Sequence, residues 1–322
     1  MIAVLAPGQG SQTPGMFEPW LSGPRAEQAD SAANLARWSE ATGLDLARLG
    51  TTADAEEIKD TAVTQPLIVA ASLLVYQQLL AALSSAGIGS GPPADTVAAG
   101  HSVGELAAAA VAGSLSADAA VELAAVRGRE MAAACALAET GMSAILGGKP
   151  EQVLERLDEL GLDPANRNGA GQVVAAGELA ALEQLAAQPP ERARVISLAV
   201  AGAFHTRYMA PAEEALRGYA EKVEFADPAL RLLSNADGDV VADGADLRSR
   251  LVAQVTLPVR WDQCMAKLAE LGVTAVVELA PAGTLTGLVK RELKGTRTIP
   301  VKTPDDLDAV IELVREHSGS QQ

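Results

Sequence analysis

Short apolar segments alternate with longer segments of helical periodicity along most of the chain. The apolar segments 2–6, 96–99, 231–235, 275–279 and 298–302 are expected to be strands. Apolar positions recur at helical spacing in the segments 54–83, 103–112, 116–138, 211–222, 246–254, 261–271 and 283–293. Because alternating strands and helices build a parallel sheet covered on both faces, the pattern predicts an α/β fold.

The pattern changes between residues 141 and 200. Strand-like and helical segments follow one another there in the order βαββαβ, at 142–148, 149–160, 163–169, 171–177, 178–188 and 192–200. This order is that of the ferredoxin-like unit. We therefore expect residues 139–201 to form a small domain inserted into a large α/β domain made of residues 1–138 and 202–322.

Composition and charge exclude several classes of protein. With 48% hydrophobic and 20% charged residues among 322, the chain has the composition of a soluble globular protein. Its longest apolar stretch, 62–76, is interrupted by polar residues and Pro, short of the roughly 20 residues that span a bilayer. The N-terminus lacks the basic region of a secretion signal, so we expect a cytoplasmic protein. A net charge of −16 argues against binding to nucleic acid or anionic membranes.

Cysteines and the C-terminus add little chemistry. Cys135 and Cys264 provide neither a disulfide framework nor the spacing of metal ligands, and we expect both to be buried without a reactive role. We expect no metal or cofactor. The polar tail at 315–322 is expected to fray, and we expect a monomer.

The sequence "GHSVG" at residues 100–104 is the strongest sign of chemistry. It lies between a predicted strand and a predicted helix, the context of a nucleophile elbow. In such an elbow a serine occupies a sharp turn, between glycines that leave room for the backbone, and its hydroxyl is exposed at the carboxyl edge of the sheet. Ser102 is therefore predicted to be a nucleophile; the alternative is a plain turn with solvated polar residues.

A serine hydroxyl needs a base to remove its proton, and the chain has only three histidines. His101 adjoins Ser102, where successive side chains point apart, and His317 lies in the polar tail. His205, in the loop after the predicted insertion, remains as the predicted general base. No acidic partner for it is evident: Glu105, Asp237, or a backbone or amide carbonyl could orient the imidazole.

Two further features bear on the predicted site. The first strand ends in a glycine-rich loop at 6–15, where the third glycine of a dinucleotide fingerprint would fall on Thr13, so nucleotide binding is disfavoured. Its backbone N–H groups are better suited to an oxyanion hole. Arg127 interrupts the apolar stripe of the helix at 116–138, and it is either buried to pair with an anion or exposed beside Arg129.

Together these segments resemble a known family. The similarity rests on "GQGSQ" (8–12), "TQP" (64–66), "GHSVGE" (100–105), "VRGREM" (126–131), "GQVVAAG" (171–177), "AFH" (203–205), "QVTLPVRW" (254–261) and "ELAPAGTLTGL" (278–288). The chain resembles the malonyl-CoA:acyl carrier protein transacylases, the free-standing acyltransferases of fatty-acid and polyketide synthesis. The resemblance extends from the first strand to about residue 310.

The resemblance implies a hydrolase-like large domain with an inserted ferredoxin-like domain, and a malonyl ester on Ser102. It implies further that the N–H groups of Gln9 and Val103 form the oxyanion hole and that Arg127 holds the malonyl carboxylate. Gln254 would orient the base, His205, through a carbonyl. The resemblance also implies that Asn166 or Asn168 faces the cleft, and that the "AFH" triplet favours malonyl over methylmalonyl groups. The implied partners are malonyl-CoA and a phosphopantetheinylated acyl carrier protein.

Two other functions compete with this one. A serine esterase or thioesterase of the α/β-hydrolase type would place its histidine late in the chain, after the acid, whereas His205 is followed by 117 further residues. A catalytically inactive domain that only docks carrier proteins would not need Ser102, His205 and Arg127 together.

Overall fold

The structure, a computed structural model, describes residues 1–89 and 91–319. Its strands are β1 (Ile2–Ala6), β2 (Val97–Gly100), β3 (Thr140–Gly147), β4 (Asp163–Gly169), β5 (Gln172–Glu178), β6 (Ala193–Ser197), β7 (Arg231–Leu232), β8 (Ala275–Glu278) and β9 (Arg297–Pro300). Its α-helices are α1 (Pro24–Gln28), α2 (Ser31–Thr42), α3 (Leu46–Thr51), α4 (Thr61–Ser85), α5 (Gly104–Val111), α6 (Ala117–Cys135), α7 (Pro150–Glu159), α8 (Leu179–Ala187), α9 (Ala210–Ala220), α10 (Gly244–Ala253), α11 (Trp261–Glu270), α12 (Thr284–Glu292) and α13 (Asp306–Gly319).

The larger sheet is parallel, as the alternating pattern predicted. Its five strands lie in the order β7-β2-β1-β8-β9. The strands β1, β2 and β8 are buried at every position, because helices cover both faces of the sheet. The segment 231–235 was predicted to be a longer strand, but only Arg231 and Leu232 pair with β2 before the chain turns away.

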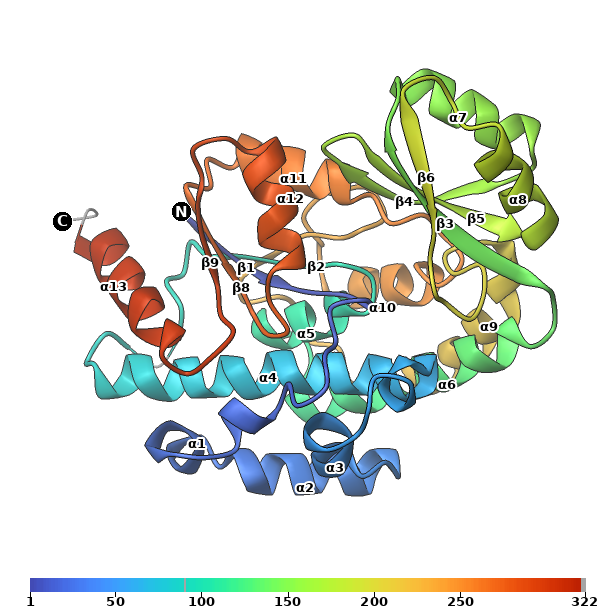
Figure 1. Ribbon diagram of the computed structural model, residues 1–322. Helices are drawn as coiled ribbons and strands as arrows, with labels where there is room; N and C mark the ends of the chain where they lie inside the picture. Colours follow the sequence, from blue (N-terminus) through green and yellow to red (C-terminus); the bar gives the residue numbers. More distant parts are fainter. Residues whose placement is uncertain (90, 320–322) are drawn as a thin grey trace.

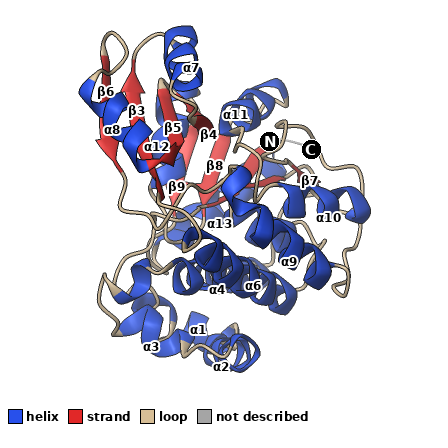
Figure 2. Ribbon diagram, turned by 90° about the vertical axis from the view of Figure 1, so that its right-hand side faces the viewer, coloured by secondary structure: helices blue, strands red, loops and turns tan. Residues whose placement is uncertain are grey.

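The smaller sheet is antiparallel and is built by β3, α7, β4, β5, α8 and β6 in that order along the chain. Its strand order, β4-β5-β3-β6, and the two helices on one face (Figure 2) make the predicted ferredoxin-like unit. The prediction of an α/β fold that contains such a unit is confirmed.

Strand β4 also joins the small sheet to the rest of the protein. The N–H of Val259 donates to the carbonyl of Ala165 at 2.8 Å, and the N–H of Arg167 donates to the carbonyl of Val259 at 2.9 Å. These two bonds form a parallel bridge between Asn166 and Val259. The edge of the small sheet is thus hydrogen-bonded to the segment that precedes α11.

The long helix α4 lies across the sheet (Figure 1) and begins later than the segment 54–83 predicted. The carboxylate of Asp60 accepts the N–H of Ala62, so it caps the helix and sets its start at Thr61. Within the described residues, α4 alone is long and apolar enough to cross a membrane, yet 78% of its most apolar window is buried inside the protein. It is the central helix of the core.

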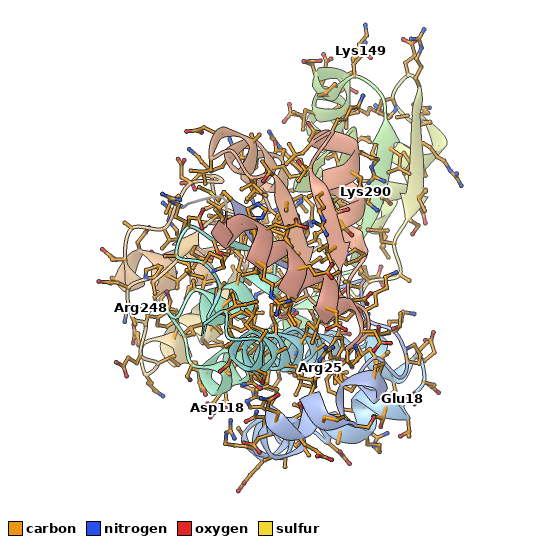
Figure 3. All side chains as sticks on the ribbon, turned by 90° about the vertical axis from the view of Figure 1, so that its left-hand side faces the viewer. Glu18, Arg25, Asp118, Lys149, Arg248 and Lys290 are labelled. Carbon is orange, nitrogen blue, oxygen red and sulfur yellow. The ribbon has the colours of Figure 1, made fainter. Side chains whose placement is uncertain are left out.

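Two helical regions were not predicted. The helices α1 to α3 cover the outer side of α4, where Trp38 is fully buried. The prediction of a frayed tail is wrong for residues 315–317, because α13 continues through His317. This helix buries Val310 and Val314 at helical spacing. Arg25 on α1, labelled in Figure 3, ion-pairs with Asp308 on α13. Residues 320–322 of the expected tail lie outside the described part of the chain.

Helices α4 and α6 approach closely at Gly128. A Cβ atom on Gly128 would lie 2.6 Å from the backbone oxygen of Thr61 and 3.2 Å from the Cβ of Gln65. Real Cβ atoms do not come that near a backbone oxygen, so the absence of a side chain sets the spacing of the two helices. This contact brings the preceding residue, Arg127, next to Gln65.

We predict that Gly128→Ala destabilises the protein by about 1–3 kcal/mol, because the added methyl group forces α4 and α6 apart. Gly218→Ala is the matched control: it lies in α9, and its added methyl group would have nothing within 4 Å. It should gain about 0.5–1 kcal/mol from its better helix propensity. Urea unfolding of both variants measures the difference, and equal changes would mean that the close contact carries no cost.

Candidate active site

The turn between β2 and α5 has the geometry of a nucleophile elbow. Ser102 has a φ of +54°, a left-handed conformation that costs a non-glycine residue about 1–2 kcal/mol. A Cβ on Gly100 would lie 2.1 Å from the backbone of Gly104, and one on Gly104 would lie 2.3 Å from the backbone oxygen of Ala6. Both glycines are therefore required for the tight turn, as the sequence predicted.

Ser102 and His205 meet at hydrogen-bond distance. The Oγ of Ser102 lies 2.7 Å from Nε2 of His205, and Nδ1 of His205 lies 2.8 Å from the backbone oxygen of Gln254. Because a carbonyl only accepts, Nδ1 carries the proton and Nε2 is free to accept the hydroxyl proton.

The orienting group left open by the sequence is thus the backbone carbonyl of Gln254. The two acidic alternatives lie elsewhere: Asp237 ion-pairs with Arg250, and Glu105 accepts the backbone N–H of Asn235. The side chain of Gln254 donates to the carbonyls of Leu257 and Pro258, which holds the turn that aims its own carbonyl.

The imidazole of His205 is held neutral. Burial and, next, the positive charge of Arg127 lower the pKa of His205 to about 3, against the raising effect of the hydrogen bond to Gln254. Since a general base must be unprotonated, this environment keeps His205 in its active form at neutral and mildly acidic pH.

The other two histidines lie in different surroundings. His101, next to Ser102 in the elbow, bonds through Nε2 to Oδ1 of Asn168 on β4 at 2.9 Å. His317 contacts Leu313 and Thr274 on the far side of the sheet. Both Asn166 and Asn168 line the cleft, and the side-chain oxygen of Asn166 has no partner among the described residues.

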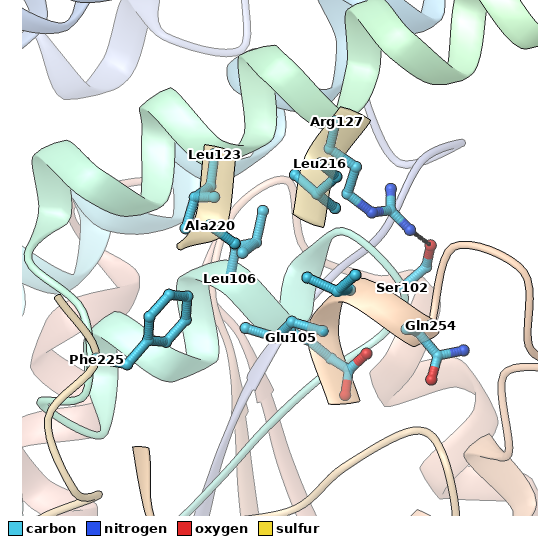
Figure 4. Close-up of a pocket in the computed structure, with 11 residues that line it drawn as sticks. Ser102, Glu105, Leu106, Leu123, Arg127, Leu216, Ala220, Phe225 and Gln254 are labelled. Atoms are coloured by element: carbon cyan, nitrogen blue, oxygen red, sulfur yellow. Dashed lines mark hydrogen bonds between the residues drawn. The ribbon is translucent and has the colours of Figure 1, made fainter. Parts of the chain in front are cut away.

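Arg127 is buried, with 4% of its surface exposed, so the buried interpretation of the sequence is the right one. Its Nη1 donates to Oε1 of Gln65 at 2.7 Å, and its Nη2 donates to Oγ of Ser102 at 3.3 Å (Figure 4). Burial lowers the pKa of Arg127 to about 10, which leaves it positively charged at neutral pH. Its neighbour Arg129 is on the surface and pairs with Glu130.

Gln65 was not identified from the sequence as a site residue. It lies fully buried on α4, and its amide also donates to the sulfur of Met131 at 3.4 Å. The only signal was the "TQP" triplet at 64–66, a polar pair in an otherwise apolar helix. Such a buried amide in a core helix has to find a partner, and its partner here is the guanidinium of Arg127.

The glycine-rich loop after β1 passes beside the elbow. A Cβ on Gly8 would lie 2.5 Å from the carbonyl of His101, so the two backbones are in contact. Among the described residues, neither the backbone N–H of Gln9 nor that of Val103 has a hydrogen-bond acceptor. The side chain of Gln9 donates to Thr61 instead. Two N–H groups beside Ser102 are therefore free to bind an anionic oxygen.

A cleft of about 330 Å³ at the carboxyl edge of the parallel sheet is lined by Gln9, Gln65, His101, Ser102, Arg127 and His205. The large sheet contributes the loop at 8–12 and the elbow, the small sheet contributes Asn166, Asn168 and Val174, and Leu285 and Leu288 come from α12. Ligands bind at this edge in open α/β sheets. Within the described residues, no group of three His, Cys, Asp or Glu side chains could hold a metal ion.

The cysteines take no part in the site. Both are free and buried, as predicted. Burial raises the pKa of Cys135 to about 11 and also raises that of Cys264, so neither forms a thiolate at neutral pH.

Glu105 lies on α5, three positions after Ser102, and only 4% of its surface is exposed. Its Oε1 accepts the N–H of Asn235 at 2.8 Å, while its Oε2 has no hydrogen-bond partner among the described residues. Burial raises the pKa of Glu105 to about 8, against the lowering effects of the Asn235 N–H and of the charges on Arg127 and Arg250. The carboxyl group is therefore mostly protonated at pH 7.

Comparison with known proteins places this geometry in a family. Residues 4–316 match the acyl transferase domain. The malonyl CoA-acyl carrier protein transacylase of Mycobacterium tuberculosis is 57% identical over 97% of this chain and all of its own length. The crystal structure of MCAT from the same organism superposes with a TM-score of 0.91 at 57% identity, covering 97% of this chain and 99% of that one.

One solved neighbour includes a carrier protein. It is PlMCAT:AntF, described as a type II PKS acyl-carrier protein in complex with its malonyl-transacylase. Its matching chain is 30% identical, has a TM-score of 0.86, and covers 97% of this chain with 99% of its own length.

We predict that Glu105→Gln makes the protein more stable than the wild type as pH rises. The folded-state pKa of about 8 exceeds the ordinary 4.5, so the stability linked to this proton is fully present below pH 4.5 and is lost up to about pH 8. The substituted amide does not titrate, whereas every other group titrates in both proteins. The difference in urea midpoint should grow from pH 5 to pH 8, and parallel curves over that range would contradict the burial of a protonated carboxyl group.

Proposed function

The chain belongs to the acyl transferase family, among the malonyl CoA-acyl carrier protein transacylases, and we propose that Ser102 carries the malonyl group which it transfers. The malonyl group moves from malonyl-CoA to the phosphopantetheine thiol of an acyl carrier protein. One observation carries this proposal: a single hydroxyl, that of Ser102, lies 2.7 Å from the base His205 and 3.3 Å from the buried cation Arg127. The first contact activates a nucleophile, and the second reads an acidic acyl group.

Acylation begins when Nε2 of His205 accepts the proton of Ser102 Oγ as the oxygen attacks the thioester carbonyl. The carbonyl oxygen becomes negative and accepts the N–H groups of Gln9 and Val103. The carbon–sulfur bond then breaks, and the proton on Nε2 passes to the departing thiolate of coenzyme A. The malonyl group remains as an ester on Ser102, and the carbonyl of Gln254 stabilises the transient imidazolium through Nδ1–H.

Transfer to the carrier protein follows the same steps with the roles of the thiols reversed. His205 accepts the proton of the phosphopantetheine thiol as the sulfur attacks the malonyl ester. The carbon–oxygen bond to Ser102 breaks, and Nε2 returns the proton to Oγ. The free enzyme is regenerated, so two half-reactions share one base and one oxyanion hole.

Arg127 supplies the selectivity for a malonyl group. Its guanidinium suits a carboxylate through two parallel hydrogen bonds, and it is buried where an unpaired charge is costly. The bond from Nη1 to Gln65 fixes the plane of the guanidinium and leaves Nη2 pointing into the cleft. A malonyl carboxylate bound there would replace the weak contact to Ser102 Oγ and free that oxygen for attack.

The competing function, that of a serine esterase or thioesterase, is not favoured by the relatives of this chain. It would use the same serine and histidine, but it would have no need of a buried guanidinium beside the nucleophile.

We further propose that the enzyme is a cytoplasmic monomer and that residues 139–201 are an inserted domain. The four-stranded sheet supports the insertion, because all four of its strands lie within that range and it adds Asn166 and Asn168 to the cleft.

The decisive test incubates the protein with labelled malonyl-CoA in the absence of a carrier protein. A stable one-to-one malonyl adduct on Ser102, located by mass spectrometry, is expected, and added holo acyl carrier protein should remove it as malonyl-carrier. Rapid release of free malonate would support the hydrolase instead. An adduct on any other residue would disprove the assignment of Ser102.

We predict that Arg127→Ala lowers kcat/KM for malonyl transfer by about a hundred-fold to several thousand-fold. Leaving one member of a buried ion pair unpaired costs roughly 3–5 kcal/mol, and about 1.4 kcal/mol corresponds to a factor of ten. Acetyl transfer should stay level or rise, because an acetyl group leaves the guanidinium unpaired. Arg129→Ala, on the same helix but exposed, is the control and should change neither rate. Equal losses for malonyl and acetyl groups would assign Arg127 to the fold rather than to the carboxylate.

A further inference from the structure

The side chain of Asn235 is bonded to the backbone on both sides of the elbow. Its Oδ1 accepts the N–H of Ser102 at 2.7 Å, and its Nδ2 donates to the carbonyl of Gly100 at 2.7 Å. Asn235 is fully buried and lies 133 positions away from Ser102 in the sequence. The side chain of Asn235 is thus hydrogen-bonded to the peptide groups immediately before and after His101.

This contact extends the parallel sheet beyond its last strand residue. The backbone of β7 pairs with β2 as far as Leu232, and the N–H of Leu233 donates to the carbonyl of Ala98. In a parallel ladder the next partner would donate to the carbonyl of residue 100 and accept the N–H of residue 102. The backbone turns away there, and the amide of Asn235 makes both bonds in its place.

Glu105 holds Asn235 in turn. Its Oε1 accepts the N–H of Asn235 at 2.8 Å, and its own N–H donates to the carbonyl of Ser102 at 3.0 Å. Ser102, Asn235 and Glu105 therefore form a closed circuit of hydrogen bonds around the elbow. The carbonyl of Asn235 accepts the N–H of Arg260 at 2.8 Å, so both backbone groups of Asn235 and its amide are bonded.

The remaining contacts of Glu105 exclude a direct part in the chemistry. Among the described residues, its carboxyl group makes no hydrogen bond to His205 and no ion pair with Arg127, and Figure 4 shows it apart from the Arg127 guanidinium. Together with Ser102 and Arg127 it lines a small cavity, whose other walls include Leu106, Leu123 and Phe225. Its carboxyl group is hydrogen-bonded to the backbone N–H of Asn235.

We infer that Asn235 and Glu105 are positioning residues: the Asn235 amide clamps the strained elbow so that Ser102 Oγ stays aimed at His205, and the Glu105 carboxyl group locks that amide in place. This inference rests on the proposed role of Ser102 as the nucleophile. It has a second consequence for the same reaction. Because the N–H of Ser102 is already bonded to Asn235, it is unavailable to the oxyanion, and the hole depends on the N–H groups of Gln9 and Val103.

The test measures single-turnover formation of the malonyl ester at varied malonyl-CoA concentration. In Asn235→Ala the rate constant at saturation should fall about 10–100-fold, a loss typical of removing a group that orients a reacting side chain. The malonyl-CoA concentration at half saturation should not change, because Arg127 and the cleft are intact. Gln78→Ala is the control, since it deletes an equally buried amide that bonds Trp20 and Ser31 and, within the described part of the chain, no residue of the elbow. It should acylate at the wild-type rate.

Two variants of Glu105 make the test independent of whether Asn235→Ala folds. Glu105→Gln keeps an oxygen that can accept the Asn235 N–H and should acylate within about threefold of the wild type, whereas Glu105→Ala should lose about tenfold in the saturating rate. Equal rates for Glu105→Ala and Glu105→Gln, or a loss in Gln78→Ala as large as that in Asn235→Ala, would overturn the inference alone. A wild-type ester on a residue other than Ser102 would overturn the proposed function as well.

Discussion

The left-handed backbone of Ser102 is the constraint on which the site depends. With a φ of +54°, the serine is held in a conformation that its side chain disfavours, at the edge where β2 turns into α5. Glycines at 100 and 104 make the turn possible, because any Cβ there would meet backbone atoms. Hydrogen bonds from both flanks then keep the turn closed. This turn places the hydroxyl of Ser102 close to His205, to Arg127 and to two free N–H groups.

Electrostatics within the cleft follow from burying a single positive charge. Arg127 forms no ion pair with any residue that the structure describes, and its charge acts on its neighbours: it helps to lower the pKa of His205 and favours a negatively charged ligand. A carboxylate beside His205 would raise the pKa of the imidazole, and the position it would take is filled by the carbonyl of Gln254. The uncharged carbonyl of Gln254 and the guanidinium of Arg127 therefore both favour the neutral form of His205. The guanidinium also favours a negatively charged ligand.

The small sheet completes the cleft rather than standing apart from it. Strand β4 is hydrogen-bonded to Val259, only a few residues from the Gln254 carbonyl that orients His205. On the other side, Asn168 bonds to His101 in the elbow itself. The segment around 254–261 is therefore in contact with both His205 and the strand that lines the cleft. A shift of the small sheet would therefore change the surroundings of both Ser102 and His205.

The sequence by itself determined the elements whose signals are local. The strand–helix alternation and the βαββαβ order identified the fold, and the "GHSVG" turn predicted Ser102 as a nucleophile, since apolar periodicity and glycine requirements act over neighbouring residues. Elimination among three histidines led to His205 as the predicted base, and the structure places it at hydrogen-bond distance from Ser102. Only the tertiary structure decided that Arg127 is buried, that Gln65 holds it, that the backbone of Gln254 replaces an acidic residue, and that Asn235 and Glu105 grip the elbow. Each of these contacts joins segments about 50 to 130 residues apart or uses a backbone atom, for which no side-chain pattern exists. The prediction of a frayed tail was wrong because the helix α13 is stabilised by packing against the core. The polar residues at 315–318 give no sign of that packing in the sequence.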